Sequence, residues 1–159
     1  MKLVHPGATS PSASAMGRGN RKTDSGPEVA IRSALHRRGF RFRKNHLIPL
    51  PDRRGIRPDV VFTKARVAVF VDGCFWHSCP IHGTMPKSNP EYWKPKLARN
   101  VERDAQDTQA LTNAGWTVVR VWEHTEPEVA AEKILKRLIE QNTSRERTYG
   151  GIGSTNQAS

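Results

Sequence analysis

The sequence predicts an α/β fold in which a mixed β-sheet is flanked by helices. Two observations carry this prediction. Short apolar runs have the length and composition of strands, and longer segments repeat apolar residues every three or four positions, as amphipathic helices do. Along the chain these segments follow the order helix, three strands, helix, strand and helix. Because strands and helices alternate in this way, we expect the helices to cover the sheet.

The first helix is expected to begin at Pro27 and to end at Gly39. Asp24 or Ser25 can cap its first turn, and Glu28 complements the positive end of the helix dipole. The residues that form its apolar stripe are Ala30, Ile31, Ala34 and Leu35.

Three strands are expected next. Residues 40–43 alternate apolar and basic side chains, as a half-buried strand does. Residues 59–62 and 67–71 are β-branched and apolar, and the connection between them has hairpin length. Residues 49–58, rich in Pro, Gly and Arg, are expected to form a loop that precedes this hairpin.

The C-terminal part is expected to contain two helices around one buried strand. The first helix should run from Pro95 to Ala114, because proline fits the first turn of a helix and Gly115 can end it. The strand should cover residues 116–122, and an amphipathic helix over residues 129–139 should close the fold. The apolar face of the first of these helices is expected to consist of Leu97, Val101, Thr108 and Leu111.

The length of 159 residues allows one domain with a real core and is too short for two. We expect this single domain to cover residues 25–141. Residues 1–24 and 142–159 are polar and Gly-rich without an apolar period, which predicts a flexible basic N-terminal tail and a flexible C-terminal tail.

The charge balance favours a polyanionic partner. The chain carries 26 Lys and Arg residues against 15 Asp and Glu residues, a formal net charge of +11. Nucleic acid is the usual partner of such a protein. Charge alone leaves an ordinary basic protein as the alternative, so the motifs must decide.

The cysteine content predicts a cytoplasmic protein. There are only two cysteines, no apolar stretch typical of a secretion signal at the start, and no run of the roughly 20 apolar residues that a membrane helix needs. In a reducing compartment, two cysteines close together in sequence more often bind a metal or take part in chemistry than form a disulfide.

Carboxylates stand at two informative places. Asp59 follows Pro58 at the start of an apolar strand, where its oxygens can hold a hard cation such as magnesium. Asn100 and Asp104 lie four residues apart on one face of a predicted helix, with Arg103 alongside. The plain alternatives are an ordinary turn aspartate and a solvated charged helix face, and each motif taken alone favours the plain alternative.

Cysteine and histidine residues cluster after the third predicted strand. Cys74, Cys79 and His82 offer two thiolates and an imidazole within nine residues, which suits tetrahedral zinc. His124, just after the last strand, is the best candidate for the fourth ligand, and His77 competes with it. A His77 that does not bind zinc is free to act as a general acid or base near neutral pH. The plain alternative is two buried free cysteines with surface histidines.

Aromatic pairs occur at Phe75-Trp76 and at Tyr92-Trp93. Covering a small core is the ordinary role of such residues, because they are costly to expose. In a basic chain the functional alternative is a wedge that enters a stack of bases.

Together these motifs resemble the very short patch repair endonucleases. The resemblance extends from about Arg21 to Thr125, most of the predicted domain. It implies a fold like that of the type II restriction endonucleases, an αβββαβ core with a zinc-stabilised loop. The matching strings are Pro27-Glu28, Arg57-Pro58-Asp59, Val-Asp-Gly-Cys-Phe-Trp-His at residues 71–77, Asn-Val-Glu-Arg-Asp at residues 100–104, Gly115-Trp116 and Val-Trp-Glu-His at residues 121–124.

The activity implied by the resemblance is magnesium-dependent nicking of duplex DNA on the 5′ side of the thymine in a T:G mismatch. This mismatch arises from deaminated 5-methylcytosine, and the nick starts its repair. The implied setting is the nucleoid of a prokaryotic cytoplasm, with a monomeric enzyme acting on double-stranded DNA beside other repair proteins.

The resemblance also implies roles for individual residues. Asp59 and the backbone carbonyl of Val71 would bind magnesium, His77 would act near the attacking water, and Asp104 and Glu28 would support the site. Residues implied to bind structural zinc are Cys74, Cys79, His82 and His124, which frees His77 for catalysis. Residues implied to contact DNA are Phe75, Trp76 and Trp93 as wedges, together with Arg103.

Two departures from the family pattern bear on specificity. Val71-Asp72 stands where the family has Thr-His, so Asp72 adds a carboxylate that can itself bind a metal. The stretch before Ile56 is also longer than the family's compact loop. Asp72 favours the rival hypothesis of a restriction or defence nuclease that needs no mismatch. A zinc-stabilised DNA-binding module without activity is the second rival, and intact Asp59 and His77 argue against it.

Overall fold

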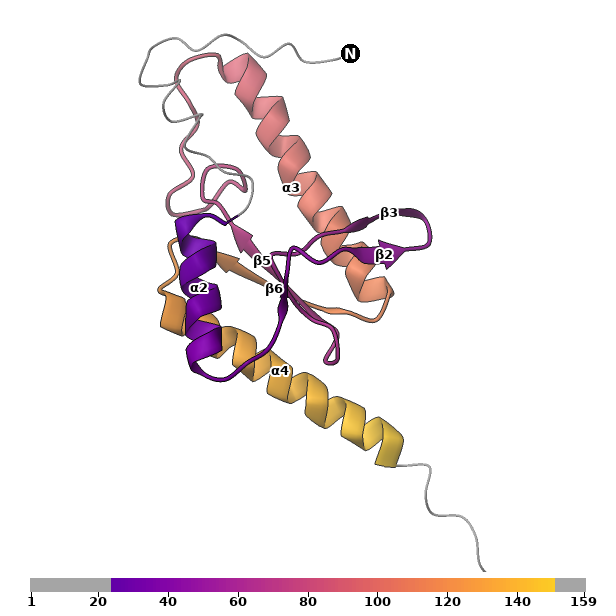
Figure 1. Cartoon of the computed structure of the whole chain (residues 1–159). Helices are drawn as coiled ribbons and strands as arrows, with labels where there is room; N and C mark the ends of the chain where they lie inside the picture. The colour runs from indigo at the N-terminus through magenta and orange to yellow at the C-terminus, as the bar shows by residue number, and fades with distance from the viewer. Residues whose placement is uncertain (1–23, 151–159) are drawn as a thin grey trace, which may run out of the picture.

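The computed structural model describes residues 24–150, with side chains through residue 148, and this part contains three helices and six strands (Figure 1). The N-terminal tail predicted over residues 1–24 therefore lies almost entirely outside the described residues. In chain order the elements are α2 (Gly26–Arg37), β1 (Arg43–Lys44), β2 (Ile48–Leu50), β3 (Arg53–Ile56), β4 (Val60–Phe62), β5 (Val67–Asp72), α3 (Pro90–Asn113), β6 (Thr117–Trp122) and α4 (Pro127–Gly150).

The main sheet has four strands in the order β1-β4-β5-β6. β4 is antiparallel to both β1 and β5, whereas β5 and β6 are parallel, with Val67 opposite Thr117 and Asp72 opposite Trp122. Helix α3 forms the crossover between the two parallel strands. The prediction of a mixed sheet flanked by helices is confirmed, and the predicted strands after residue 59 all lie in this sheet.

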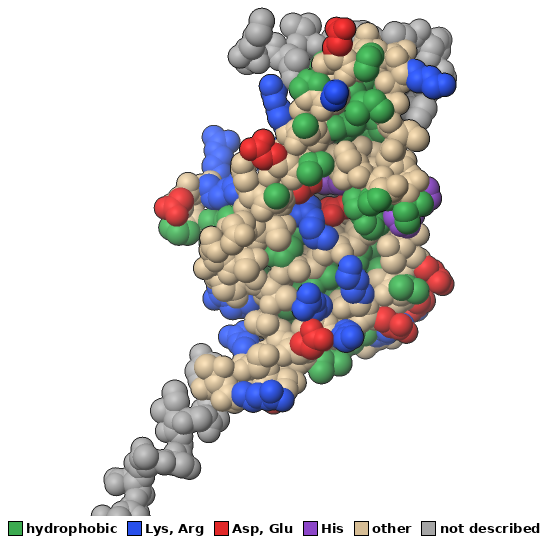
Figure 2. Space-filling view, turned by 180° about the vertical axis from the view of Figure 1, so that it is seen from behind, with side chains coloured by type: hydrophobic (Ala, Val, Ile, Leu, Met, Phe, Trp, Pro, Cys, Tyr) green, Lys and Arg blue, Asp and Glu red, His purple; other side chains and the backbone are tan. Residues whose placement is uncertain are grey.

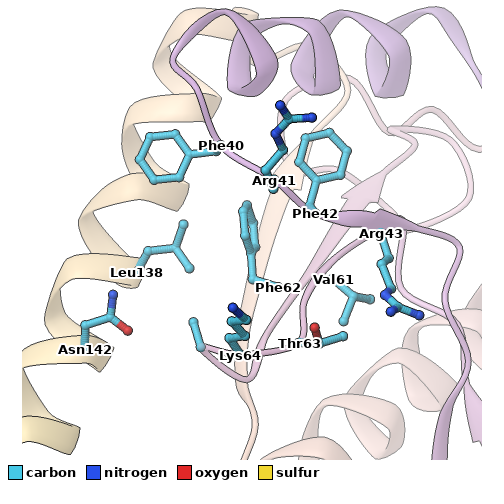
Figure 3. A pocket seen from close by; sticks show the side chains of 11 residues that line it. Phe40, Arg41, Phe42, Arg43, Val61, Phe62, Thr63, Lys64, Leu138 and Asn142 are labelled. Carbon is cyan, nitrogen blue, oxygen red and sulfur yellow. The ribbon is translucent and has the colours of Figure 1, made fainter.

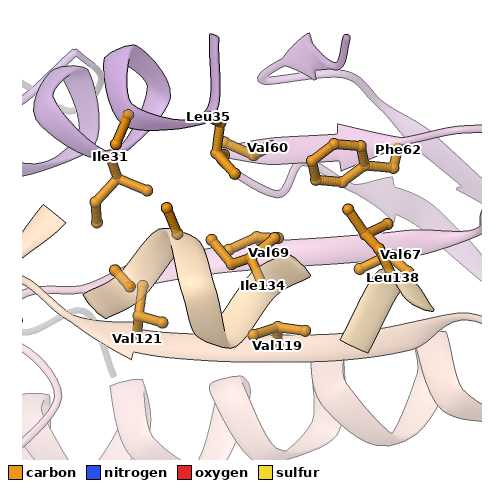
Figure 4. Close-up of a cluster of buried hydrophobic side chains, with 13 residues drawn as sticks. Ile31, Leu35, Val60, Phe62, Val67, Val69, Val119, Val121, Ile134 and Leu138 are labelled. Carbon is orange, nitrogen blue, oxygen red and sulfur yellow. The ribbon is translucent and has the colours of Figure 1, made fainter. Parts of the chain in front are cut away.

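One face of the sheet packs against α2 and α4. Alternate strand residues point to this face, because successive side chains of a strand lie on opposite sides. Figure 4 shows them interleaved with side chains from both helices. The buried residues of this cluster are Ile31, Ala34, Leu35, Val60, Phe62, Val67, Val69, Val119, Val121, Ala130, Ala131, Ile134 and Leu138.

The other face packs against α3 and a separate two-stranded hairpin, β2–β3. Its buried apolar cluster is smaller and consists of Ile48, Ile56, Val61, Ala68 and Leu111. The same alternation that buries Ala68 here also turns Phe70, Asp72 and Arg120 toward α3. This face therefore carries charges within its packing.

The start of α2 differs in detail from the expected cap. Ser25 occupies the cap position, but neither its side chain nor that of Asp24 caps a helix N–H. Instead the backbone N–H of Asp24 and the hydroxyl of Ser25 donate to the Glu28 carboxylate, over 2.9 and 3.0 Å. Glu28 therefore closes the first turn, and it is buried.

The segment after α2 was predicted as a strand over residues 40–43, but only Arg43–Lys44 pair with β4. Phe40 closes the turn that ends α2, because its N–H donates to the Leu35 carbonyl. The phenylalanines point inward beside Phe62 and line a depression of about 410 Å³ toward α4 (Figure 3). The alternation of apolar and basic residues therefore predicts correctly which side chains are partly buried, but most of the segment does not pair with the sheet.

The loop predicted over residues 49–58 is wrong, because residues 48–56 form the β2–β3 hairpin. Ile48 and Ile56 pair across it and are both buried. Gly55 has a φ of +90°, and an added Cβ would lie 2.6 Å from the Ile48 carbonyl oxygen, so only glycine fits there. Burial of Ile48 and Ile56 therefore stabilises a hairpin in a segment whose composition is typical of loops.

Both long helices extend beyond their predicted bounds. α3 begins at Pro90, which leaves Pro95 inside the helix rather than in its first turn, and Val101 is 43% exposed rather than part of the apolar face. α4 begins at Pro127 and continues to Gly150, so the predicted C-terminal tail starts as helix. Among the described helices, none combines the length and apolar character required to cross a bilayer.

Helix α4 also runs along the outer edge of β6. The Lys133 ammonium donates to the Arg120 carbonyl over 2.8 Å, and the Thr117 hydroxyl donates to Gln141 Oε1 over 2.8 Å. Farther along, Arg145 Nη1 donates to the Lys64 carbonyl over 2.6 Å. These contacts give the C-terminal part of α4 a place on the domain, where sequence periodicity predicts no helix.

Candidate functional site

The start of β4 and the end of β5 meet at one edge of the sheet, because these strands are antiparallel. Asp59 immediately precedes β4, and its Oδ2 accepts a hydrogen bond from the Val71 N–H over 2.7 Å. The Asp59 carboxylate is thereby fixed beside the last residues of β5, within reach of the loop that follows.

Two further acidic residues, Glu28 and Asp72, act on Asp59, and the nearby Arg32 offsets them in part. Burial above all, and then the charges of Glu28 and Asp72, raise the pKa of Asp59 to about 6, although the Val71 N–H and Arg32 act in the opposite direction. Glu28 reaches this place from the first turn of α2, where Arg32 Nη1 lies 3.7 Å from its carboxylate. A group of oxygen ligands with surplus negative charge is the setting that a hard divalent cation prefers.

His77 lies in the loop after β5 and faces α3. Its Nδ1 forms a hydrogen bond with Asp104 Oδ2 and lies 3.8 Å from Asp72 Oδ1. The His77 side chain is 24% exposed, so part of the ring remains accessible. With Arg120 and Val101, these three residues line a depression of about 260 Å³.

Arg120 is a member of this group that the sequence analysis missed. Its guanidinium contacts both oxygens of Asp72, with Nε–Oδ2 at 2.8 Å and Nη2–Oδ1 at 3.0 Å, and lies 3.4 Å from Asp104 Oδ1. Burial alone would lower the pKa of Arg120, but the neighbouring carboxylates, Asp72 first, raise it. The signal in the sequence was a lone arginine between valines in an apolar strand, since a buried charge requires a partner.

A second cluster combines the loop after β5 with the segment after β6. One ligand atom from each of Cys74, Cys79, His82 and His124 lies within 4.8 Å of all the others. Cys74 Sγ is 3.0 Å from His124 Nδ1 and 3.9 Å from His82 Nδ1, and Cys79 Sγ is 3.9 Å from His124 Nδ1. Ligand atoms around tetrahedral zinc are separated by roughly 3.3–3.8 Å, so the four residues can hold such an ion.

The same cluster is tied to the end of the sheet. Glu123 Oε1 accepts a hydrogen bond from the Cys74 N–H over 2.7 Å, and the Glu123 N–H donates to the Asp72 carbonyl over 2.9 Å. Burial, followed by the neighbouring Cys79, raises the pKa of the Cys74 thiol to about 11. A cation among these groups would favour the thiolate form, as metal coordination requires.

Aromatic side chains form a third group next to His77. The ring of Phe75 lies 5.1 Å from that of Trp76 and 5.3 Å from that of Trp93, and the Lys96 ammonium lies 5.3 Å from the Trp93 ring. All three rings are half-buried. Figure 2 shows hydrophobic side chains gathered toward the end of the molecule where α3 begins. Arg103 is exposed on α3, and its Nη2 donates to Asn100 Oδ1 over 3.0 Å.

Comparison with known proteins identifies the family. The family model described as DNA mismatch endonuclease Vsr matches residues 9–82. The type II nicking enzyme V.NaeI of Lentzea aerocolonigenes is 54% identical over 119 residues, which cover 75% of this chain and 72% of the relative. The chain belongs to the Vsr family of DNA endonucleases.

Two further relatives are also similar to this chain. The type II nicking enzyme V.XorIIP of Xanthomonas oryzae pv. oryzae is 45% identical over 65% of this chain and 73% of its own length. The DNA mismatch endonuclease Vsr of Escherichia coli is 37% identical over 63% of this chain and 62% of its own length. The Vsr relatives confirm the resemblance seen in the motifs and support a DNA endonuclease over a binding module without activity.

The predicted site residues of this Vsr endonuclease fall into three neighbouring groups. The structure places His77 against Asp104, and His77 is not among the four residues of the cysteine and histidine cluster. It places Asp72 against Arg120, a pairing that no sequence pattern predicted. Arg103 lies on the same helix as Asp104, but among the described residues its side chain bonds to Asn100 and not to the site.

Proposed function

We propose that this Vsr endonuclease nicks duplex DNA on the 5′ side of the thymine in a T:G mismatch by magnesium-dependent hydrolysis, and so starts very short patch repair of deaminated 5-methylcytosine. The observation that supports this proposal most strongly is that the Val71 N–H fixes Asp59 beside the end of β5, where the next residue, Asp72, lies 3.8 Å from His77 of the His77–Asp104 pair. The Escherichia coli relative is named a mismatch endonuclease.

Asp59 and the backbone carbonyl of Val71 would hold the magnesium ion. The residues fit this role because Asp59 Oδ2 is fixed by the Val71 N–H, while its Oδ1 has no hydrogen-bond partner among the described residues. The negative charges of Glu28 and Asp72 add to the attraction for a cation. When bound, magnesium supplies charge stabilisation at the scissile phosphate and the leaving oxygen.

His77 would handle the proton of the attacking water. Its Nδ1 is occupied by Asp104, which orients the ring and leaves Nε2 for the water. The Asp104 carboxylate also stabilises the imidazolium that forms when His77 accepts the proton, as the aspartate does in other histidine–aspartate pairs. Glu28 supports the site from α2 by binding the backbone that leads into the first turn.

Phe75, Trp76 and Trp93 would enter the base stack next to the mismatch. A mispaired step costs less to open than a paired one, by a few kcal/mol at most, and this difference is a physical source of selectivity. Arg103, exposed on α3, would contact a phosphate. The net charge of +11 predicts that binding weakens steeply as salt is raised.

Cys74, Cys79, His82 and His124 would bind one structural zinc ion. Four protein ligands leave zinc no open position, so its role would be to fold the loop that carries His77 and two of the aromatic residues. We expect purified protein to contain one zinc per chain by elemental analysis, and Cys79→Ala to lose it. A wild-type protein without zinc after growth in zinc-supplemented medium would contradict this assignment.

A nicking assay tests the proposed activity. A duplex with one T:G mismatch is compared with its T:A and C:G counterparts, with magnesium and with EDTA added only for the reaction. We expect a magnesium-dependent nick on the thymine strand of the T:G duplex alone. Absence of any nick, with DNA binding intact, would contradict the proposed activity.

A type II nicking activity without a mismatch requirement is the second candidate, because relatives at 54% and 45% identity are named type II nicking enzymes. The same panel of duplexes separates the two. Cutting of the paired duplexes at a rate comparable to the T:G duplex would establish the second candidate, and adding methylated duplexes would show whether modification matters.

A further inference from the structure

Asp72 is the last residue of β5, turned toward α3 and only 7% exposed. A buried carboxylate without a partner is costly, and here the partner is Arg120 on the neighbouring strand. Both carboxylate oxygens are engaged by the guanidinium in a paired, fork-like contact at 2.8 and 3.0 Å. To bind a metal, Asp72 would have to share its oxygens with a guanidinium whose fixed positive charge repels the cation.

The Arg120 guanidinium reaches beyond Asp72 to α3. Nη2 lies 3.4 Å from Asp104 Oδ1, while Nη1 donates to the Asp104 carbonyl over 3.3 Å and to the Thr108 hydroxyl over 3.0 Å. Its underside covers the ring of Phe70 at 4.7 Å. One side chain therefore joins the end of β5, the middle of β6 and the turn of α3 between Asp104 and Thr108.

His77 lies between the two carboxylates that Arg120 holds. Its Nδ1 forms a hydrogen bond with Asp104 Oδ2 and is 3.8 Å from Asp72 Oδ1. The four side chains share the walls of one depression. The position of the His77 ring thus depends on two anionic groups, and the position of each depends on the same guanidinium.

We propose that Arg120 is a positioning residue of the nuclease site. By holding Asp72 and Asp104, it fixes the orientation of the His77 ring and keeps Asp72 out of the ligand set of the catalytic metal. Asp59 is then the carboxylate that binds the metal, and Asp72 serves the histidine. This inference rests on the proposed function, which assigns the metal to Asp59 and the proton to His77.

The first test reads the His77 ring directly. We would record histidine ring NMR signals of the full-length protein at one pH, for the wild type and for Arg120→Lys. Lysine keeps the charge but cannot contact both Asp72 oxygens and Asp104 together. We expect the His77 signals to shift while those of His36 and His46 stay in place. Unchanged His77 signals in a folded Arg120→Lys protein would overturn the proposal.

The chain offers a matched control in Arg53→Gln. Arg53 forms an ion pair with Asp107 of α3 at 2.7 Å on the same side of the sheet, outside the depression. We expect this variant to leave both the His77 signals and the nicking rate unchanged. If Arg120→Lys does not fold, the double variant Asp72→Asn with Arg120→Gln replaces it, because a neutral pair leaves no buried charge alone, and the same His77 shift is expected.

The second test reads the metal, with Mn²⁺ alone as the probe in a binding titration. We expect Asp72→Asn to change the Kd for Mn²⁺ by less than about threefold and Asp59→Asn to weaken it tenfold or more. Equal weakening by both variants would overturn the part of the proposal that concerns Asp72. If Asp59→Asn has no effect, the metal site of the proposed function fails, while the NMR result still decides the role of Arg120.

The third test measures the nicking kinetics of the Arg120→Lys variant. Loss of a group that orients a site residue typically lowers activity about 10–100-fold. For Arg120→Lys we expect this loss in kcat on the T:G duplex, with KM nearly unchanged, because the variant retains the charge and the DNA-contacting rings. A loss confined to KM would show that Arg120 acts on DNA binding and would overturn a positioning role.

Discussion

The two faces of the sheet differ in what they contain. The face toward α2 and α4 buries thirteen apolar residues in one cluster, whereas the face toward α3 and the hairpin buries five. On the α3 face the packing is interrupted by Asp72 and Arg120, and by Asp104 and Asp107 of the helix itself. The fold is held mainly by the first face, and this frees the second to hold charges whose arrangement serves chemistry rather than stability.

The largest effect on activity is expected from a substitution at Asp59. Asp59→Asn removes the proposed metal ligand with almost no change in shape, so nicking should fall by about three orders of magnitude or more, because metal assistance is worth several kcal/mol. The variant should still fold and bind the T:G duplex, as measured by circular dichroism and fluorescence anisotropy. Wild-type nicking by this variant would remove Asp59 from the site.

The opposite behaviour is expected on the α2 and α4 face. Ile134 is fully buried there, and Ile134→Ala should reduce the free energy of unfolding by about 2–5 kcal/mol through lost burial and the cavity left behind. Urea denaturation measures this loss. Nicking per folded molecule should be unchanged at a temperature where the variant is folded, and a selective loss of kcat there would contradict the division between the faces.

The raised pKa of Asp59 also predicts how the free energy of unfolding depends on pH. The pKa of Asp59 is raised to about 6 from its ordinary value of 3.8, so ionising it costs more in the folded than in the unfolded protein. This cost is absent below about pH 4 and is complete above about pH 6. Without added divalent cation, Asp59→Asn should therefore be more stable than the wild type by roughly 1–3 kcal/mol at pH 7. The two proteins should be equally stable at pH 4, and urea denaturation at both pH values checks this.

The smallest effect is expected for the partly exposed ion pair between Arg53 and Asp107. Arg53→Gln should cost at most about 1 kcal/mol of unfolding free energy, since solvent screens such pairs. Because this pair lies on the α3 face but outside the depression, nicking should be unaffected. A marked loss of nicking would show that the functional region extends to the hairpin.

Local sequence patterns were sufficient for the strands and helices that bury a continuous apolar face. β5 and β6 follow directly from their β-branched runs, and α2 follows from its stripe. The β2–β3 hairpin was not predictable in this way, because only the pairing of Ile48 with Ile56 stabilises a segment whose composition is typical of loops. The start of α3 at Pro90 was missed because two prolines lie close together and either could begin a helix.

The site residues also divide into those that local sequence predicts and those that only the tertiary structure identifies. Ligand chemistry and motif resemblance singled out the cysteines, His124 and Asp59 from the sequence. The pairing of Asp72 with Arg120, 48 positions away, depends on the parallel register of β5 and β6, which no local pattern encodes. The isolated charge in β6 showed that a partner must exist, but only the tertiary structure identifies it.

The contact between Lys133 and the Arg120 carbonyl has a consequence for self-association. Thr117 and Glu123 direct their N–H groups to β5, so the intervening residue Arg120 presents its backbone to the outside, where β6 has no further strand among the described residues. An uncovered edge strand can recruit a strand from another molecule, and here α4 runs along the edge. The Lys133 ammonium occupies one acceptor on this edge and adds a positive charge there, and lysines at sheet edges are one of the features by which natural proteins discourage edge-to-edge pairing.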